Sequence, residues 1–369
     1  MSLRAGVPVH GGNLWAAAQR RGIPAEEWLD FSADLNPWAR DWVPAVVVEE
    51  AWRRIQHYPD PMYLRFRQAT AAWDKVEVSA ILPGNGTADL IHLISRWRKA
   101  ARAWIPVPTF TEYARAVRSN GGTVTPGLLS EQDDFGGSGL LQVLKHTPVD
   151  VVFLCNPNNP TGRIWPREAV LELLEWCARN QILLVVDEAY MDLTADGLRY
   201  SLAGEAARNR HLLVLRSLTK AFGIPGLRLG YAVGHPSVIE PLQAIQPPWP
   251  VNTLAAEAGT WLLESAGEAL ADSRRRLAAA REEMREALSR LPQLRLFSSE
   301  ANFFLVRLNE RSRGAQHAAD RLEKQGVLIR CCDDFEGLAP DRFLRMAVRR
   351  PEENRLFVEA LTEVLNRAG

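Results

Sequence analysis

The segment Leu213-Val-Leu-Arg-Ser-Leu-Thr-Lys-Ala-Phe-Gly-Ile-Pro-Gly-Leu-Arg-Leu-Gly-Tyr231 places a lysine, Lys220, between hydroxyl-bearing residues and glycines. The apolar run before Ser217 predicts a buried strand that empties into a loop, and open parallel sheets carry their reacting groups at such strand ends. An ammonium group held among apolar side chains loses hydration, so its pKa falls and a free amine becomes available near neutral pH. The alternative is a solvated loop lysine, as most lysines are.

Polar motifs follow the other predicted strands as well. A strand ending at Gly84 precedes Gly86 and Thr87, whose backbone could hold an anion at a helix start or could form a plain turn. Strand alternates with helix along this part of the chain, which predicts an α/β fold with a mostly parallel central sheet and helices on both faces. The predicted strands cover residues 103–108, 149–154, 182–186, 212–215 and 229–233.

The length of 369 residues and the 47% hydrophobic content allow two domains with substantial cores. We expect residues 1–45 to form an amino-terminal segment that joins the small domain, and residues 46–265 to form the large domain. Residues 266–369 then form a smaller α+β domain, with strands over residues 303–308, 327–330 and 343–348. No internal repeat or low-complexity linker interrupts this plan.

The 44 basic and 44 acidic residues cancel, so no net field draws the chain to nucleic acid or to an anionic membrane. A small-molecule partner is therefore expected. The four cysteines show no zinc-binding spacing, so no metal is expected, and we interpret them as reduced thiols of a cytoplasmic protein. The start of the chain lacks the apolar region of a signal peptide, and no run of eighteen apolar residues occurs.

Two motifs together resemble the cofactor-lysine segment of the fold-type I pyridoxal-phosphate enzymes, the aspartate aminotransferase superfamily. They are Ser-x-Thr-Lys, ending at Lys220, and Gly-x-Arg-x-Gly-Tyr, centred on Arg228. The resemblance implies the fold of that superfamily, pyridoxal 5'-phosphate as cofactor and Lys220 as the amine that holds its aldehyde. It also implies that Asp187 keeps the pyridine nitrogen protonated, although an aspartate at a strand end is otherwise often a helix cap.

The same resemblance assigns the other cofactor contacts. Tyr190 and Asn159 would bind the ring hydroxyl and Phe110 would stack on the ring, while Tyr58 would reach across from the second subunit of a homodimer. The phosphate group would be held by Gly86, Thr87, Ser217, Thr219 and Arg228.

Further segments resemble the threonine-phosphate decarboxylases of cobalamin biosynthesis, a family similar to the histidinol-phosphate aminotransferases. These segments include His-Gly-Gly-Asn at residues 10–13, Leu-Asp-Phe-Ser at 29–32, Trp-x-Val-Asn at 249–252 and Phe-Leu-Arg-x-Ala-Val-Arg at 343–349. The resemblance implies L-threonine O-3-phosphate as substrate and (R)-1-amino-2-propanol O-2-phosphate as product. The implied substrate-binding residues are His10, Gly11, Gly12, Asn36, Asn159, Arg330 and Arg345.

The roles of the two arginines stay open at this point. Either could bind the substrate carboxylate or phosphate, or each could be an arginine paired with a nearby acid. Arg330 is followed by Asp333, Asp334 and Glu336, which would repel a dianion unless they point outward. Asp34 also stands where relatives often carry a neutral residue.

Three rival functions remain. A histidinol-phosphate aminotransferase would use the same cofactor residues and move the amino group to 2-oxoglutarate. A pyridoxal-phosphate-binding regulator would carry an appended DNA-binding domain, and no basic helix-turn-helix precedes the cofactor domain. A Rossmann dehydrogenase would need Gly-x-Gly-x-x-Gly opening a helix, which the sequence lacks.

Overall fold

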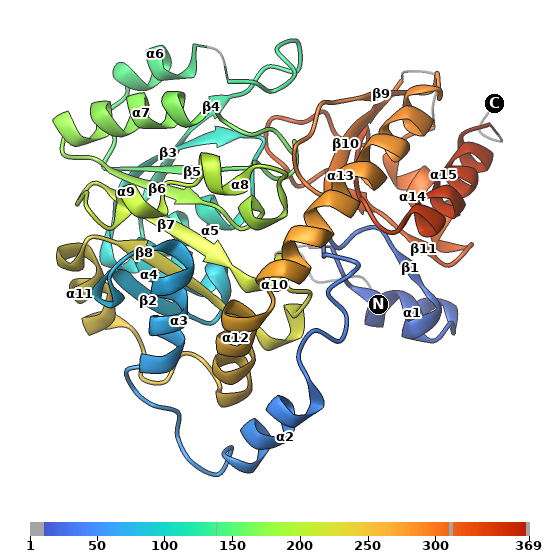
Figure 1. Ribbon diagram of the computed structural model, residues 1–369. Coiled ribbons are helices and arrows are strands. Elements are labelled where there is room, and N and C mark those ends of the chain that lie inside the picture. Colours follow the sequence, from blue (N-terminus) through green and yellow to red (C-terminus); the bar gives the residue numbers. More distant parts are fainter. Residues whose placement is uncertain (1–10, 138, 310–312, 367–369) are drawn as a thin grey trace.

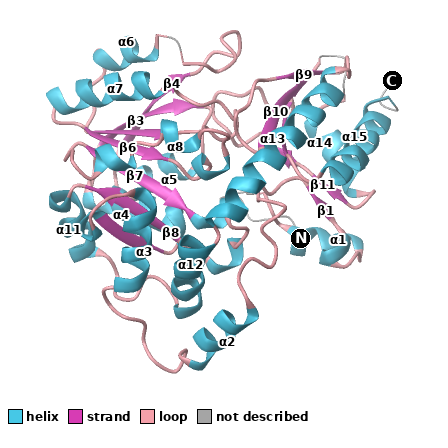
Figure 2. Ribbon diagram, viewed as in Figure 1, coloured by secondary structure: helices cyan, strands magenta, loops and turns pink. Residues whose placement is uncertain are grey.

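The computed structural model describes residues 11–137, 139–309 and 313–366. Figure 1 shows a large sheet flanked by helices beside a smaller sheet, with the amino-terminal segment running between them. Figure 2 shows helices on both sides of the large sheet. Within the described residues, no helix is both long enough and apolar enough to span a bilayer.

The large sheet has seven strands in the order β2-β8-β7-β6-β5-β3-β4. All neighbours run parallel except β8, which is antiparallel to both β2 and β7. We predicted a mostly parallel sheet, but we predicted neither the reversal of β8 nor the presence of β4. The strands are β2 (Ile81–Gly84), β3 (Arg102–Val107), β4 (Thr123–Leu128), β5 (Val151–Cys155), β6 (Leu183–Asp187), β7 (Leu212–Ser217) and β8 (Gly230–Gly234).

The reversal of β8 follows from the short connection before it. Residues 218–229 contain only two single-turn helices, α10 (Leu218–Ala221) and η4 (Pro225–Leu227), and a parallel crossover normally contains a full helix. Gly230 of β8 therefore pairs with Ser217 at the end of β7 and with Gly84 at the end of β2. Arg228 is thereby brought to the edge of the sheet where the parallel strands end.

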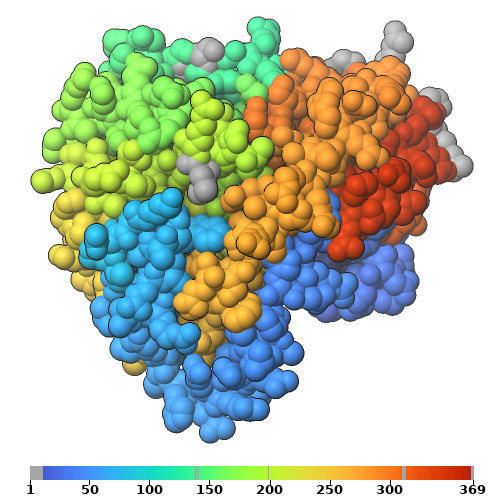
Figure 3. Space-filling view, viewed as in Figure 1, coloured from blue at the N-terminus to red at the C-terminus, as the bar shows by residue number. Residues whose placement is uncertain are grey.

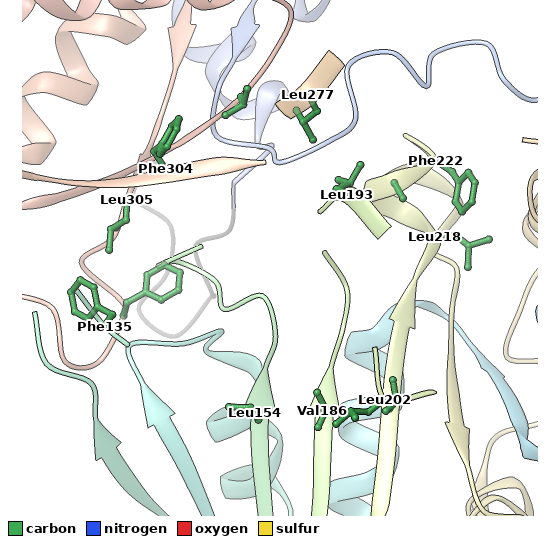
Figure 4. Close-up of a cluster of buried hydrophobic side chains, with 14 of the residues drawn as sticks. Phe135, Leu154, Val186, Leu193, Leu202, Leu218, Phe222, Leu277, Phe304 and Leu305 are labelled. Carbon is green, nitrogen blue, oxygen red and sulfur yellow. The ribbon is translucent and has the colours of Figure 1, made fainter. Parts of the chain in front are cut away.

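Alternate residues of the central strands pack into two separate cores, as the two-residue repeat of a strand requires. On one face, Val185 and Leu215 join a cluster with helices α4 (Gly86–Trp97), α5 (Glu112–Ser119) and α11 (Pro236–Ile245). On the other face, Val186 and Val214 join the main cluster, part of which Figure 4 shows. Helices packed there include α3 (Leu64–Asp74), α7 (Arg167–Arg179), α9 (Ala203–Ala206) and α12 (Thr253–Ser265).

The smaller sheet is antiparallel throughout, in the order β12-β13-β10-β9. We predicted one strand over residues 327–330, but it is split in two. Its first part, β11, pairs in parallel with β1 of the amino-terminal segment, and its second part, β12, pairs with β13. The strands are β1 (Leu29–Asp30), β9 (Leu294–Leu296), β10 (Phe303–Leu308), β11 (Val327–Leu328), β12 (Arg330–Cys331) and β13 (Phe343–Ala347).

The β1–β11 pairing ties the two ends of the chain together, and Figure 3 shows the amino-terminal segment beside the carboxyl-terminal helix α15. Ring stacking of Phe31 on Phe357 of α15 adds to this contact. The remaining helices are α1 (Leu14–Arg21), η1 (Ala25–Glu27), α2 (Ala45–Arg53), η2 (Val78–Ala80), α6 (Leu140–Lys145), η3 (Met191–Leu193), α8 (Gly197–Tyr200), α13 (Gly267–Ser289), α14 (Ala315–Glu323) and α15 (Pro351–Asn366).

Candidate active site

A cavity of about 480 Å³ lies where the parallel strands of the large sheet end, facing the amino-terminal segment and the smaller sheet. It brings together residues from segments that are far apart in the sequence. This agrees with the rule that open parallel sheets carry their reacting groups where the strands end, which we call the strand-end rule. Most of the residues that we predicted from the sequence line it: Gly11, Gly12, Gly86, Thr87, Phe110, Asn159, Asp187, Tyr190, Ser217, Thr219, Lys220, Arg228, Arg330 and Arg345.

Lys220 lies on α10 directly after β7, and its side chain is partly buried at the cavity wall. Its Nζ atom lies 5.6 Å from the centroid of the Tyr190 ring. Burial lowers the pKa of the Lys220 amine, while the carboxylate of Asp34 opposes this shift and Arg345 adds to it. The sequence therefore folds so that Lys220 presents an amine that deprotonates more easily than a solvated lysine.

Asp187 ends β6 and is fully enclosed at the cavity. Its Oδ2 atom accepts a 2.8 Å hydrogen bond from the Tyr113 hydroxyl, and its Oδ1 atom accepts one of 3.0 Å from the Ala189 amide. Burial raises the pKa of Asp187 to about 6, although both hydrogen bonds and the nearby Lys220 act to lower it. An ionised Asp187 is a buried carboxylate that could hold a cationic group in the cavity.

An anion cradle, which we define as Gly86, Thr87, Ser217, Thr219 and Arg228, lies at the start of α4. Asn85 makes no side-chain cap there, and the helix start favours an anion. Gly86 has a φ of 79°, and a Cβ atom at this position would lie 2.9 Å from Nη2 of Arg228. The Ser217 and Thr219 hydroxyls lie 2.8 Å apart. Hydroxyls, a helix start and a guanidinium together suit a phosphate group.

Both candidate substrate arginines are paired with carboxylates, the alternative that the sequence left open. Arg345 is buried and places Nη2 2.8 Å from Asp34. Its Nη1 donates to the Asn159 side chain at 2.6 Å and its Nη2 donates to the Ser32 carbonyl at 2.9 Å. Tyr190, expected to face a ring hydroxyl, donates its hydroxyl to Asp34 at 3.1 Å.

Arg330 forms a two-point contact with Asp334, at 2.6 and 2.7 Å. Of the three acids that follow Arg330, only Asp334 turns toward it. Asp333 accepts from the Asp341 amide at 2.8 Å, and Glu336 is half exposed and lies 3.9 Å from Arg118. Repulsion of a dianion by all three acids is therefore avoided, but Arg330 is already neutralised.

Three predicted residues are not placed in the cavity wall. Asn36 is buried, with its side chain donating to the Ala221 carbonyl at 2.8 Å and its amide donating to the Lys220 carbonyl at 3.0 Å, so it fixes the lysine backbone. Tyr58 is 78% exposed and stacks on Trp249 away from the cavity. His10 lies outside the described residues.

Several wall residues were not predicted from the sequence, notably Asp30, Asp34, Glu112, Tyr113, Arg115 and Cys155. Tyr113 lies in the first turn of the helix after β3, so the strand-end rule could have identified it. The Asp34–Arg345 pair joins residues more than 300 positions apart, and no local pattern signals it. Within the described part of the chain, no group of three or more His, Cys, Asp or Glu residues is placed to hold a metal ion.

The model of the family "Aminotransferase class I and II" matches residues 27–361. The chain belongs to this family. A relative from Salmonella typhimurium, a threonine-phosphate decarboxylase, is 35% identical over 96% of this chain and 96% of its own. A histidinol-phosphate aminotransferase from Desulfitobacterium hafniense is 31% identical over 95% of this chain and 94% of its own.

Solved structures of the family have the same fold. An L-threonine-O-3-phosphate decarboxylase from Porphyromonas gingivalis superposes with a TM-score of 0.77 at 30% identity, covering 87% of this chain and 94% of its own. A histidinol-phosphate aminotransferase from Sinorhizobium meliloti, solved with pyridoxal-5'-phosphate, superposes with a TM-score of 0.82 at 21% identity, covering 100% and 98%. The latter likeness bears on the fold alone.

Proposed function

We propose that this aminotransferase-family chain binds pyridoxal 5'-phosphate and decarboxylates L-threonine O-3-phosphate to (R)-1-amino-2-propanol O-2-phosphate, a step of cobalamin biosynthesis. The observation that carries the proposal is one cavity that joins the Lys220 amine, the buried Asp187 carboxylate and the anion cradle. The 35% identity to a threonine-phosphate decarboxylase over nearly the whole of both chains supports the choice of reaction.

The residues fit the cofactor on structural grounds. The cradle is narrow enough that a Cβ atom at Gly86 would crowd Arg228, and Asp187 is the buried carboxylate that a protonated pyridine nitrogen needs. Lys220 would hold the aldehyde, while Phe110 and Asn159 would contact the ring. When bound, the cofactor supplies an aldehyde that captures the substrate amine and a ring that stabilises negative charge at Cα.

The chain's own residues then control the outcome. Lys220 would hold and move the proton at Cα, and its lowered pKa makes transfer in either direction easier. The orientation of the bound substrate would decide which bond at Cα breaks, so the residues that bind the substrate anions would select decarboxylation. Arg345 and Arg330 are the cationic wall residues on the side of the smaller sheet, together with the glycine amides at Gly11 and Gly12.

A homodimer is part of this proposal. Helix α2 projects from the lower edge of the molecule in Figure 1, and it exposes Val46, Val48 and Trp52. Tyr58, which follows α2 in the sequence, forms an exposed aromatic pair with Trp249. Exposed apolar patches of this kind mark protein interfaces, and a second copy would cover them and bring Tyr58 to the partner's cradle. Trp52→Asp should shift the sedimentation of the protein toward the monomer.

The division into residues 1–45, 46–265 and 266–369 also remains our proposal, and the β1–β11 pairing supports joining the first unit to the third. We place the enzyme in the cytoplasm because Cys155, Cys177, Cys331 and Cys332 are all free thiols.

The deciding experiment compares two reactions of the purified protein. Threonine phosphate should release carbon dioxide, whereas histidinol phosphate with 2-oxoglutarate should form no glutamate. The reverse result would establish the aminotransferase instead. Lys220→Ala should lose the absorbance band that borohydride abolishes in the wild type, and its rate should fall on the order of a thousandfold.

A further inference from the structure

Two buried polar atoms at the cavity have no partner in the described part of the chain. One is Oδ1 of Asp34, an acceptor, and the other is Nε of Arg345, a donor. Their residues already contact one another through Oδ2 and Nη2, at 2.8 Å, and the Asp34 and Arg345 side chains are 0% and 6% exposed. Buried polar groups almost always find partners, so an unmatched donor and an unmatched acceptor on two residues that contact each other point to a ligand that supplies both.

The remaining atoms of the pair are held by the protein. Tyr190 donates to Oδ2 of Asp34, and Asn159 and the Ser32 carbonyl accept from the two Nη atoms of Arg345. This leaves Arg345 able to take an incoming anion through Nε and the second N–H of Nη1, while Nη2 is fully used by Ser32 and Asp34. An anion that arrives alone would place a second negative charge beside the buried carboxylate, which a low-dielectric site strongly disfavours.

A ligand that carries an anion and an adjacent ammonium group avoids this penalty. The anion meets Nε of Arg345, and the ammonium meets Oδ1 of Asp34. The α-carboxylate and α-ammonium groups of an amino acid are such a pair, separated by a single carbon atom. A 2-oxo acid has the anion and lacks the cation.

We propose that Asp34 is a specificity-determining residue that selects zwitterionic α-amino acids over anions of the same skeleton without an amino group. This inference rests on the proposed function and deepens it. In the second half-reaction of a transamination the same cavity must accept a 2-oxo acid. Decarboxylation requires the cavity to accept only the amino acid. Asp34 therefore biases the site toward the decarboxylase.

The test measures the affinities of the cofactor-loaded enzyme for two matched ligands by calorimetry. L-2-Amino-3-phosphonopropionate and 3-phosphonopropionate share carboxylate, phosphonate and carbon chain, and differ only in the amino group. We expect the preference for the amino compound to fall about tenfold in Asp34→Asn, mainly because 3-phosphonopropionate binds more tightly. An unchanged preference, or weaker binding of 3-phosphonopropionate to the variant, would overturn the proposal.

Asp334→Asn is the matched control, because it removes the carboxylate from the other arginine, Arg330, at a more exposed position. It should change the affinity for both ligands by the same factor. Tyr190→Phe keeps the charge of Asp34 and should keep the preference.

A second measurement needs only the wild type, in case Asp34→Asn fails to fold. Trimethylammonium, which has one N–H donor and cannot condense with an aldehyde, should strengthen the binding of 3-phosphonopropionate. Tetramethylammonium at equal ionic strength should not, and equal effects of the two cations would contradict the role of Asp34. Neither measurement depends on turnover, so absence of carbon dioxide release from threonine phosphate would refute the proposed reaction and leave this selectivity standing.

Discussion

The Tyr113 hydroxyl donates a 2.8 Å hydrogen bond to Oδ2 of Asp187, and both side chains are buried. The bond stabilises the ionised carboxylate where burial alone favours the protonated form.

Cofactor affinity should fall as the pH falls through about 6. Burial places the pKa of Asp187 at about 6, above its ordinary value of 3.8. Below that pH the unliganded carboxyl holds a proton that the cationic ring nitrogen must displace, so the dissociation constant should rise about tenfold per pH unit. The cofactor phosphate titrates in the same pH range. The effect of Asp187 is therefore the difference between the pH profiles of the dissociation constant for the wild type and for Asp187→Asn. Parallel profiles would show that Asp187 does not hold the ring.

Tyr113→Phe should move the loss of cofactor affinity at acid pH, which we call the acid limb of the profile, to higher pH. Losing one hydrogen bond to the charged form is worth about 1 kcal/mol, which raises the pKa of Asp187 by up to about one unit. Tyr63→Phe is the control, since Tyr63 is also buried and donates to the Val251 carbonyl at 2.9 Å, outside the cavity wall. It should lower stability without moving the limb. A shift of equal size in both variants would point to a general structural effect.

Gly86→Ala should weaken cofactor binding more than it weakens the fold. The new Cβ would lie 2.9 Å from Nη2 of Arg228 and push the guanidinium out of the anion cradle. Gly121→Ala is a close control, because Gly121 has the same φ of 79° and nothing within 4 Å of its ideal Cβ position. Each variant should lose about 1–2 kcal/mol of unfolding free energy to the left-handed backbone. Only Gly86→Ala should raise the cofactor dissociation constant, as measured by fluorescence titration.

Arg216→Met should destabilise the chain strongly while sparing the residues of the cavity wall. Arg216 faces away from the cavity and contacts Glu188 at 2.9 Å, Asp192 at 2.8 Å and Asp74 at 3.5 Å, all at buried positions. Removing the cation leaves uncompensated buried carboxylates, at a cost of about 3–5 kcal/mol in urea unfolding.

The comparison for Arg216→Met is Arg102→Met, which breaks the exposed pair with Asp150. That change should cost less than about 1 kcal/mol. Similar losses in the two variants would mean that the Arg216 cluster contributes no more than a surface pair.

The sequence allowed the cavity to be predicted because its residues obey a local rule. Asp187 is the last residue of a buried strand, Lys220 and Asn159 each follow one, and the ends of parallel strands lie on one edge of a sheet. The direction of β8 did not follow from its own apolar pattern, which is the same for either direction, but from the short connection before it. The partner of a buried charge is equally nonlocal: Asp34 meets Tyr190 across 156 positions.

The sequence pattern also did not distinguish residues that position the backbone of the site from residues that would contact the substrate. Asn36 resembles a substrate residue in sequence, yet its side chain is used to hold the backbone beside Lys220. That distinction depends on which way one side chain turns, and the residue type alone does not determine it.

The cavity wall is built from both ends of the chain, and this has a consequence for synthesis on the ribosome. The seven-stranded sheet can form once residue 234 has emerged, but the cavity wall also needs Gly11 from one end of the chain and Arg345 from near the other. A nascent chain therefore carries an open site until its last strand, β13, is made. We expect cofactor retention by stalled chains to begin only when that strand has left the exit tunnel.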